Sequence, residues 1–307
     1  SSAEVMRILV SKEVHTNLPQ TDERQRANVI QCELDESHGL RSLWKNTKLL
    51  LSGSTCVFTI FGPLYAAPVG CKSIVGFAQP WIIYPKNECY EMLSWRNRLM
   101  LKAKYWLQSQ FFKFSDAIIV ELEHVKIGLI RELGVNPDRI HIVHNCISSL
   151  YLNESLWQTL KIPPVECDVQ LGFLGRNYLH KNTIIFPEIL EELESKHGLR
   201  AKFFVTFTQD EWESCSPEFR SACLNVGPLT VNQCPSFYRA MDAIVFPSLL
   251  ECFSATPLEA MAMEKPLFAS DRPFNRDICG EHAYYFDPLD PSSAANSIAD
   301  FLNHRNT

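Results

Sequence analysis

The sequence predicts an α/β protein with two domains, each built on a parallel β-sheet covered by helices. The chain has 307 residues, which is more than a single hydrophobic core usually holds. Short apolar runs alternate with longer stretches of helical period, and strands separated by helices in this way form parallel sheets with right-handed crossovers. The alternation breaks down near Ile162-Pro163-Pro164, so the predicted domains are 1–158 and 159–307.

The composition is that of a globular protein and argues against several functional classes. Hydrophobic residues make up 46% of the chain and charged residues 21%. No apolar run reaches the roughly 18 residues of a membrane span, and the first residues lack the layout of a secretory signal. The net charge of -6 gives no general attraction to nucleic acid. The eleven cysteines include no Cys-x-x-Cys pair, so we expect a cytoplasmic protein without a structural metal site.

The amino-terminal half contains short apolar runs that predict buried strands and two stretches that predict helices. The predicted strands are 55–61, 73–78, 116–121 and 139–144, whereas 6–10 fits either a strand or the end of a helix. The predicted helices are 92–114 and 122–133, and Gly134 ends the second one.

The stretch 92–114 combines basic and aromatic residues on one predicted helix. It carries Arg96, Arg98, Lys102, Lys104 and Lys113 without a single acid, interleaved with Trp95, Tyr105, Trp106, Phe111 and Phe112. A basic helix with interfacial aromatic residues suits an anionic membrane surface or a lipid-diphosphate acceptor. The alternative is a solvated outer face over a domain core. Peripheral membrane contact through 92–114, at the inner face of the membrane, is therefore a second expectation.

The carboxy-terminal half repeats the alternation of strand and helix. The predicted strands are 169–174, 201–208, 226–229, 243–246, 266–270 and 283–286. The predicted helices are 184–197 and 234–241, with two more that start at Thr256 and Pro291.

Two cations follow the first strand of this half. Gly175 and Arg176 come directly after the strand at 169–174, and Lys181 lies five residues beyond the arginine at a predicted helix start. A strand-to-helix turn of this kind offers fixed positive charge and backbone N–H groups to one diphosphate. The alternative is surface charge on an ordinary turn.

Two carboxylates bracket the loop that follows the strand at 243–246. Glu251 lies in an apolar loop, where a buried carboxylate needs a partner, and Glu259 lies in the first turn of the next helix. The start of this helix, at Thr256, presents unpaired N–H groups to a phosphate beyond the carboxyl end of a strand. Carboxylates are good acceptors for sugar hydroxyls. For Glu259 the alternative is a capping box with Thr256.

The segment 243–265 resembles the carboxylate signature of retaining GT-B glycosyltransferases, especially glycosyltransferase family 4. In that family two glutamates eight positions apart flank a Gly-Phe-Gly-like loop, and Glu251 and Glu259 have this spacing. The resemblance implies that Glu251 contacts the donor sugar, that Glu259 binds the ribose, and that Phe253 and Ser254 are loop contacts. The chain departs from the family at Cys252 and Ser254, where glycine is common.

The resemblance also implies roles for residues outside this segment. Gly175, Arg176 and Lys181 match the Gly-Arg and Lys-Asn arrangement with which family 4 enzymes bind the donor diphosphate. Gln79 stands near the strand end where similar transferases place a histidine, and it can hydrogen-bond to the sugar but cannot take a proton at neutral pH. Asn145 is what remains here of the family's Pro-Asn-Gly-Val segment.

The fold implied by the resemblance is GT-B, in which two Rossmann-like domains face a cleft. The family usually opens with a strand and a glycine-rich loop, and because no early Gly-x-Gly turn is present we expect a truncated amino-terminal domain. The implied activity is transfer of a hexose, with retained stereochemistry, from a nucleoside-diphosphate sugar to a glycan or lipid-linked acceptor. No metal or other cofactor is expected, and cell-surface polysaccharide synthesis is the implied setting. The alternatives are a non-catalytic nucleotide-sugar-binding subunit and a GT-B epimerase or phosphorylase.

Overall fold

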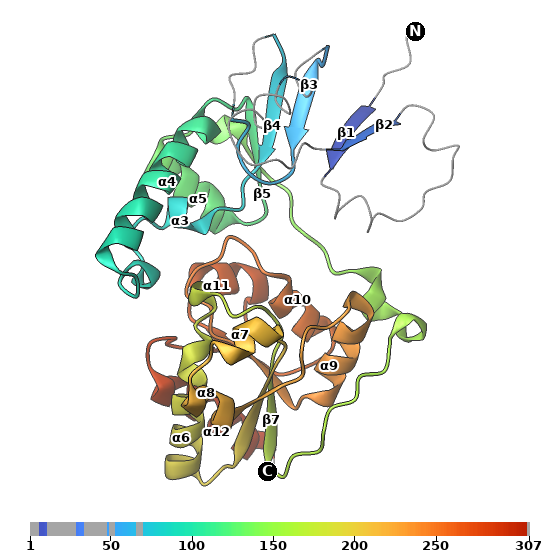
Figure 1. Ribbon diagram of the computed structural model, residues 1–307, viewed down its shortest axis with the longest axis vertical. Helices are drawn as coiled ribbons and strands as arrows, with labels where there is room; N and C mark the ends of the chain where they lie inside the picture. Colours follow the sequence, from blue (N-terminus) through green and yellow to red (C-terminus); the bar gives the residue numbers. More distant parts are fainter. Residues whose placement is uncertain (1–5, 11–28, 34–47, 49–52, 66–69, 306–307) are drawn as a thin grey trace. The chain divides into compact units, whose positions relative to one another are not determined.

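The computed structural model describes residues 6–10, 29–33, 48, 53–65 and 70–305, and their strands form three sheets (Figure 1). The chain divides into two compact units. One contains the described residues up to 77 together with 106–119 and 135–141, and the other contains 78–105, 120–134 and the rest of the chain from 142. The domain boundary proposed after residue 158 stays a prediction.

The strands of the amino-terminal half lie close to the predicted positions. β1 (Met6–Val10) pairs in parallel with β2 (Val29–Glu33), which settles 6–10 as a strand. The four-stranded sheet has the order β3-β4-β5-β6. Its strands are β3 (Cys56–Thr59), β4 (Lys72–Gly76), β5 (Ala117–Val120) and β6 (Ile140–Ile142).

Three α-helices accompany these strands among the described residues. They are α3 (Pro80–Ile83), α4 (Trp95–Lys113) and α5 (Glu123–Leu133). Gly134 ends α5 with φ 65°, a left-handed conformation that glycine adopts without steric cost. The sequence predicted α4 and α5 but not the single turn of α3.

The carboxy-terminal half contains a six-stranded sheet in the order β12-β11-β10-β7-β8-β9, and all its strand pairs are parallel. Its strands are β7 (Val169–Phe173), β8 (Ala201–Val205), β9 (Cys223–Asn225), β10 (Ala243–Phe246), β11 (Leu267–Ser270) and β12 (Tyr284–Phe286). The strand predicted at 226–229 is wrong, because β9 ends at Asn225. Gly227 with φ 87° and Pro228, which has no N–H, then take the chain out of the ladder.

The order of this sheet reverses between β7 and β10. The chain runs from β7 to β8 and β9 on one side, and from β10 to β11 and β12 on the other. Helices of this half cover the sheet on its two faces (Figure 1). In an open parallel sheet, the loops that leave the carboxyl ends of the two central strands diverge at such a reversal and leave a crevice for ligands.

Seven α-helices follow the strands of this half. They are α6 (Phe186–His197), α7 (Gln209–Glu213), α8 (Pro217–Ala222), α9 (Cys234–Ala240), α10 (Ala255–Ala262), α11 (Pro273–Cys279) and α12 (Pro291–Arg305). The short helices α7, α8 and α11 were not predicted. Two of them carried readable signals: Thr208 forms a capping box with Glu211 at α7, and Ser216 caps α8 before Pro217.

An aromatic core holds this sheet against α6. Phe186 stacks on Phe203 of β8 with ring centroids 3.9 Å apart, and Phe173 of β7 packs edge-on against Phe186. All three side chains are fully buried. Gly172 of β7 is equally constrained, because an added Cβ would lie 2.5 Å from the Met241 side chain. The ends of β7 and β10 are therefore fixed on a rigid platform. Of the helices described, none has the length and hydrophobicity needed to cross a bilayer.

Candidate functional site

The loops that leave β7 and β10 meet at the carboxyl ends of the two central strands. The backbone N–H of Leu249, in the loop after β10, donates to the carbonyl of His180, in the loop after β7, at 2.8 Å. Both loops therefore have a fixed mutual position at the point where the strand order reverses.

An ion pair joins the side chains of these loops. The Nζ of Lys181 lies 2.6 Å from Oε1 of Glu251, and the side chains are only 15% and 10% exposed. The hydroxyl of Ser248 also donates to Oε1 of Glu251, at 2.9 Å. The Lys181 ammonium lies 5.0 Å from the ring centroid of Phe246. The prediction that a buried Glu251 needs a partner is confirmed, and the partner is one of the two predicted cations.

Buried hydrogen bonds from β11 and α11 fix the backbone of the Glu251 loop. The hydroxyl of Ser270, at the end of β11, donates to the carbonyl of Ser248 at 2.5 Å. The amide of Asn275 in α11 donates to the carbonyl of Ser270 at 2.8 Å. Ser248, Ser270 and Asn275 are each fully buried, so these bonds have little competition from water. The ion pair therefore stands on a loop whose backbone is already fixed.

Glu259 is oriented by a tyrosine rather than by a helix cap. The hydroxyl of Tyr238, a fully buried residue of α9, donates to Oε2 of Glu259 at 2.7 Å. Burial first and the charge of Glu259 second raise the pKa values of Tyr238 and Tyr151, so both phenols stay protonated and able to donate.

The capping-box alternative for Glu259 is wrong. Ser254, not Thr256, is the N-cap of α10, and its side chain makes no capping bond. Thr256 lies one residue inside the helix, is buried, and its hydroxyl donates to the carbonyl of Leu174 at 3.4 Å. Ser254 is buried and Phe253 half-buried between the ion pair and the helix start. The Glu259 carboxylate is held by Tyr238, and the side chain of Tyr151 also forms a hydrogen bond with it.

Arg176 is not brought to the Lys181–Glu251 pair. Its Nε donates to both carboxylate oxygens of Glu211, at 2.8 and 3.0 Å, and Glu211 is fixed by the capping box at the start of α7. The backbone of Gly175 instead contacts Thr206, whose hydroxyl accepts from the Gly175 N–H at 3.1 Å. Of the two cations that were predicted to converge, Lys181 lies beside Glu251 and Arg176 is bound to Glu211 instead.

Gln79 lies next to the Glu251 loop through its backbone, whereas Asn145 is bonded to Glu121. Gln79 precedes α3 as its N-cap, without a side-chain capping bond, and its backbone forms a hydrogen bond with the thiol of Cys252. The amide of Asn145 donates to Oε1 of Glu121 at 2.8 Å. Burial raises the pKa of the Glu121 carboxyl, and the bond from Asn145 opposes this rise. The side chain of Gln79 keeps its hydrogen-bonding capacity, whereas that of Asn145 is engaged.

His124 fixes the backbone of the Glu251 loop through hydrogen bonds of its ring. Its Nε2 lies 2.9 Å from the carbonyl oxygen of Cys252, and its Nδ1 lies 2.7 Å from the hydroxyl of Tyr84. Because a carbonyl can only accept, Nε2 carries the proton and Nδ1 accepts from Tyr84. The backbone N–H of His124 donates to Asp277 at 2.9 Å. The ring thus holds the backbone directly after Glu251.

Acid should weaken this arrangement. Burial lowers the pKa of His124 below the usual value of about 6.5, and the bond to Cys252 and the charge of Asp277 oppose this only in part. The unfolded state therefore binds more protons once the pH falls below about 6.5, so the stability from neutral His124 is complete above that pH and declines below it. Thermal melts at pH values from about 7.5 to about 5.5 measure the difference in melting temperature between the wild type and His124→Gln. This difference should shrink as the pH falls. A difference that stays constant over this range would contradict the assignment.

His180 is a second residue of the site that its sequence did not single out. Its Nε2 lies 3.8 Å from Oε1 of Glu251, next to Lys181 in the chain. Burial lowers the pKa of His180, and the neighbouring Glu251 opposes this shift. Its position directly before Lys181 was the only available signal. A neutral imidazole at this place can hydrogen-bond to a ligand without competing with Lys181 for Glu251.

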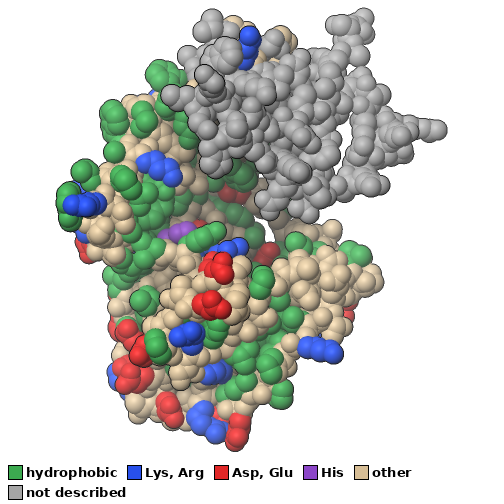
Figure 2. Space-filling model, viewed as in Figure 1, with side chains coloured by type: hydrophobic (Ala, Val, Ile, Leu, Met, Phe, Trp, Pro, Cys, Tyr) green, Lys and Arg blue, Asp and Glu red, His purple; other side chains and the backbone are tan. Residues whose placement is uncertain are grey.

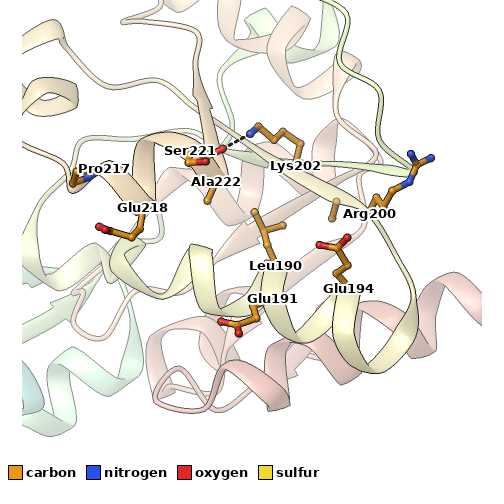
Figure 3. A pocket seen from close by; sticks show the side chains of 10 residues that line it. Leu190, Glu191, Glu194, Arg200, Lys202, Pro217, Glu218, Ser221 and Ala222 are labelled. Atoms are coloured by element: carbon orange, nitrogen blue, oxygen red, sulfur yellow. Dashed lines mark hydrogen bonds between the residues drawn. The ribbon is translucent and has the colours of Figure 1, made fainter.

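A separate hollow of about 780 Å³ lies between α6, α8 and β8, as Figure 3 shows. Ala201 and Lys202, the first residues of β8, line it, so it is at the amino end of that strand. Its lining contains three acids, Glu191, Glu194 and Glu218, besides the cations Arg200 and Lys202. In open parallel sheets ligands bind at the carboxyl ends of the strands. The hollow is therefore at the wrong edge of the sheet for the ligand site. In the described part of the chain, no group of three or more His, Cys, Asp or Glu side chains is placed to hold a metal ion.

Comparison with known proteins shows which families the chain resembles. Residues 168–304 match the family described as glycosyl transferases group 1. The O-antigen chain mannosyltransferase RfbU of Salmonella typhimurium is 22% identical over 206 residues, which are 63% of this chain and 55% of that protein. The chain therefore spans little more than half the length of this curated relative.

Two solved structures show the fold. A glycosyltransferase from Rickettsia africae superposes with a TM-score of 0.64 at 15% identity, over 99% of this chain and 81% of that chain. Anabaena HepE in complex with UDP and glucose gives a TM-score of 0.61 at 14% identity, over 92% of this chain and 79% of that chain. The GT-B fold class predicted from the sequence is confirmed.

Proposed function

We propose that the protein transfers a sugar from a nucleoside-diphosphate sugar to a glycan or lipid-linked acceptor, and the match of residues 168–304 to the group 1 glycosyl transferases supports this proposal. The observation that carries the proposal is the Lys181–Glu251 pair at the reversal of the strand order. A buried cation and carboxylate at this edge of a parallel sheet suit a ligand with an anionic part and a hydroxylated part.

Each residue of the site is proposed to contact a different part of the donor. Lys181 faces the diphosphate and stabilises the charge that develops when the nucleoside diphosphate departs, and the N–H groups at the start of α10 add to this. Glu251 accepts hydrogen bonds from sugar hydroxyls, and Glu259 accepts from the ribose hydroxyls while Tyr238 holds its other oxygen. Arg176 reaches the diphosphate only after leaving Glu211. This division needs no metal ion.

The proposed stereochemical outcome is retention. We propose that donor and acceptor meet on the same face of the sugar, as the resemblance to family 4 implies. Gln79 then acts as a hydrogen-bonding group toward the donor sugar, because an amide cannot serve as a base at neutral pH. Cys252 remains an inert buried thiol, since burial raises its pKa.

The names of similar proteins support a hexose donor. RfbU is described as an O-antigen chain mannosyltransferase, and the HepE structure contains UDP and glucose. We therefore propose a hexose as the transferred group and cell-surface polysaccharide synthesis as the setting.

A thermal-shift panel with GDP, UDP, ADP and their hexose conjugates tests the donor site. A nucleotide at 100 times its Kd adds about 2.7 kcal/mol to the free energy of unfolding, so one base should raise the melting temperature clearly above the others. Each nucleoside diphosphate is compared with the corresponding nucleoside monophosphate, which lacks the second phosphate that Lys181 would contact. If no nucleoside diphosphate raises the melting temperature more than its monophosphate, the proposed donor site is wrong.

A non-catalytic nucleotide-sugar-binding subunit is the second candidate, and Gln79 in place of a histidine favours it. Turnover separates the candidates. A transferase consumes the donor with an acceptor present, a binding subunit shifts the melting temperature but consumes none, and an epimerase converts the donor without an acceptor.

A further inference from the structure

Helix α4 is attached to the protein by one of its faces. Phe112 is fully buried and packs edge-on against Phe77 with ring centroids 4.7 Å apart. Seven positions before Phe112, Tyr105 stacks on Trp81 with ring centroids 5.7 Å apart. A surface helix anchored in this way is expected to present polar residues on its opposite face.

The opposite face of α4 is apolar instead. We define the α4 outer face by its exposed large side chains: Trp95, Leu99, Met100, Trp106 and Leu107. The two tryptophans are 70% and 67% exposed. Trp95, Leu99 and Trp106 are spaced by four and seven positions and so form one stripe, with Met100 and Leu107 beside it.

The same face continues beyond both helix ends. Met92 before α4 and Phe114 after it are also exposed. In Figure 2 hydrophobic side chains gather over the region of α4 together with basic ones. Single exposed apolar residues are ordinary, but a continuous stripe of this length on one helix marks an interaction surface.

The charge of the helix shows what this surface meets. Five basic residues and no acid lie between 92 and 114, although the chain as a whole carries a net charge of -6. Lys102 and Lys104 are exposed, and their ammonium groups lie 5.0 Å and 5.4 Å from the ring centroids of Tyr90 and Tyr105. Arg96 lies over the ring of Trp95 at 5.3 Å. Two copies of the chain that met through this face would bring like charges together, which disfavours a homodimer. An anionic and partly apolar surface complements both properties.

We propose that the α4 outer face binds the surface of an anionic lipid bilayer. The helix lies in the plane of the membrane, with its tryptophan and aliphatic side chains at the boundary of headgroups and acyl chains. Lys102 and Lys104 reach the lipid phosphates. This binding is separate from the donor site and needs no nucleotide.

Flotation of the full chain with vesicles tests the proposal. The chain should float with phosphatidylcholine vesicles that contain about one third phosphatidylglycerol, and at least tenfold less with phosphatidylcholine alone. Raising the salt from about 0.1 to about 1 M shortens the Debye length from roughly 10 to 3 Å and should release most of the bound protein. Lipids brominated near the headgroup should quench tryptophan fluorescence only in the anionic vesicles.

Two variants and one control assign the effect to α4. Lys102→Glu with Lys104→Glu, and separately Trp95→Ser with Trp106→Ser, should each weaken binding to anionic vesicles at least tenfold. These exposed substitutions should leave the melting temperature and the nucleotide-induced thermal shift unchanged. The control reverses the exposed Lys161 and Lys196, both outside α4, to Glu; it changes the net charge equally and should keep the binding.

Other outcomes overturn the proposal. Equal flotation with neutral vesicles, or equal loss in the control, would mean that lipid binding does not depend on the charge of α4. If the protein ignores both vesicles but forms a dimer that the tryptophan variant abolishes, the surface is a protein interface. A missing nucleotide shift with intact vesicle binding would contradict only the proposed transfer activity.

Discussion

Lys181→Ala is expected to reduce donor turnover about a thousandfold and to lower the free energy of unfolding by about 3 kcal/mol. Turnover falls because the departing diphosphate loses the cation that neutralises it. Stability falls because Glu251, only 10% exposed, keeps its charge without its 2.6 Å partner. Steady-state kinetics and urea denaturation measure the two effects separately.

A double variant separates the two roles of Lys181. Glu251→Gln in the Lys181→Ala background removes the unpaired charge, so stability should recover by more than half while turnover stays lost. Lys196→Ala is the matched control, since its ion pair with Glu192 is on the exposed face of α6 and should matter little. Full turnover in Lys181→Ala would remove the basis of the proposed function.

The strands β10 and β11 were predictable from the sequence because they are buried on both faces. Ala243–Phe246 is buried at all four positions, and a short run of apolar residues between turn residues has few other solutions. The run 226–229 after β9 was misleading because it also contains apolar residues. Val226 and Leu229 are apolar, but Gly227 and Pro228 between them cannot continue a ladder.

The ion pair was predictable in part. Lys181 and Glu251 each follow a predicted parallel strand, and the carboxyl ends of neighbouring strands meet at one edge of a sheet. Arg176 follows the same strand as Lys181, yet Glu211 holds it. That competitor lies 35 positions away, on a short helix that the pattern did not predict. Local spacing therefore identified the right loop but not the orientation of each cation.

The supporting residues could not be predicted, because their partners are distant in the sequence. His124 meets the carbonyl of Cys252 across 128 positions, and Tyr238 meets Glu259 from the preceding helix. Neither bond has a spacing signature. The Thr256-to-Glu259 spacing even favoured a capping box, and the tertiary bond from Tyr238 prevailed over it.

The Tyr238–Glu259 bond leads to a second large effect. Glu259→Gln is expected to weaken nucleoside-diphosphate binding roughly 10- to 100-fold, because the ribose hydroxyls lose a charged acceptor. Binding of inorganic pyrophosphate, which has no ribose, should not change. Isothermal titration with both ligands measures the difference.

Tyr238→Phe tests whether the buried hydroxyl positions Glu259. The variant removes only the donor at 2.7 Å, so Glu259 keeps its charge but loses its fixed orientation. We expect severalfold weaker nucleoside-diphosphate binding, unchanged pyrophosphate binding and a loss of about 1 to 2 kcal/mol in stability. Tyr285→Phe is the matched control, because its hydroxyl donates to the carbonyl of Gly280 at 2.7 Å and should affect stability alone. Equal losses for both ligands in Tyr238→Phe would mean that Glu259 does not recognise the ribose.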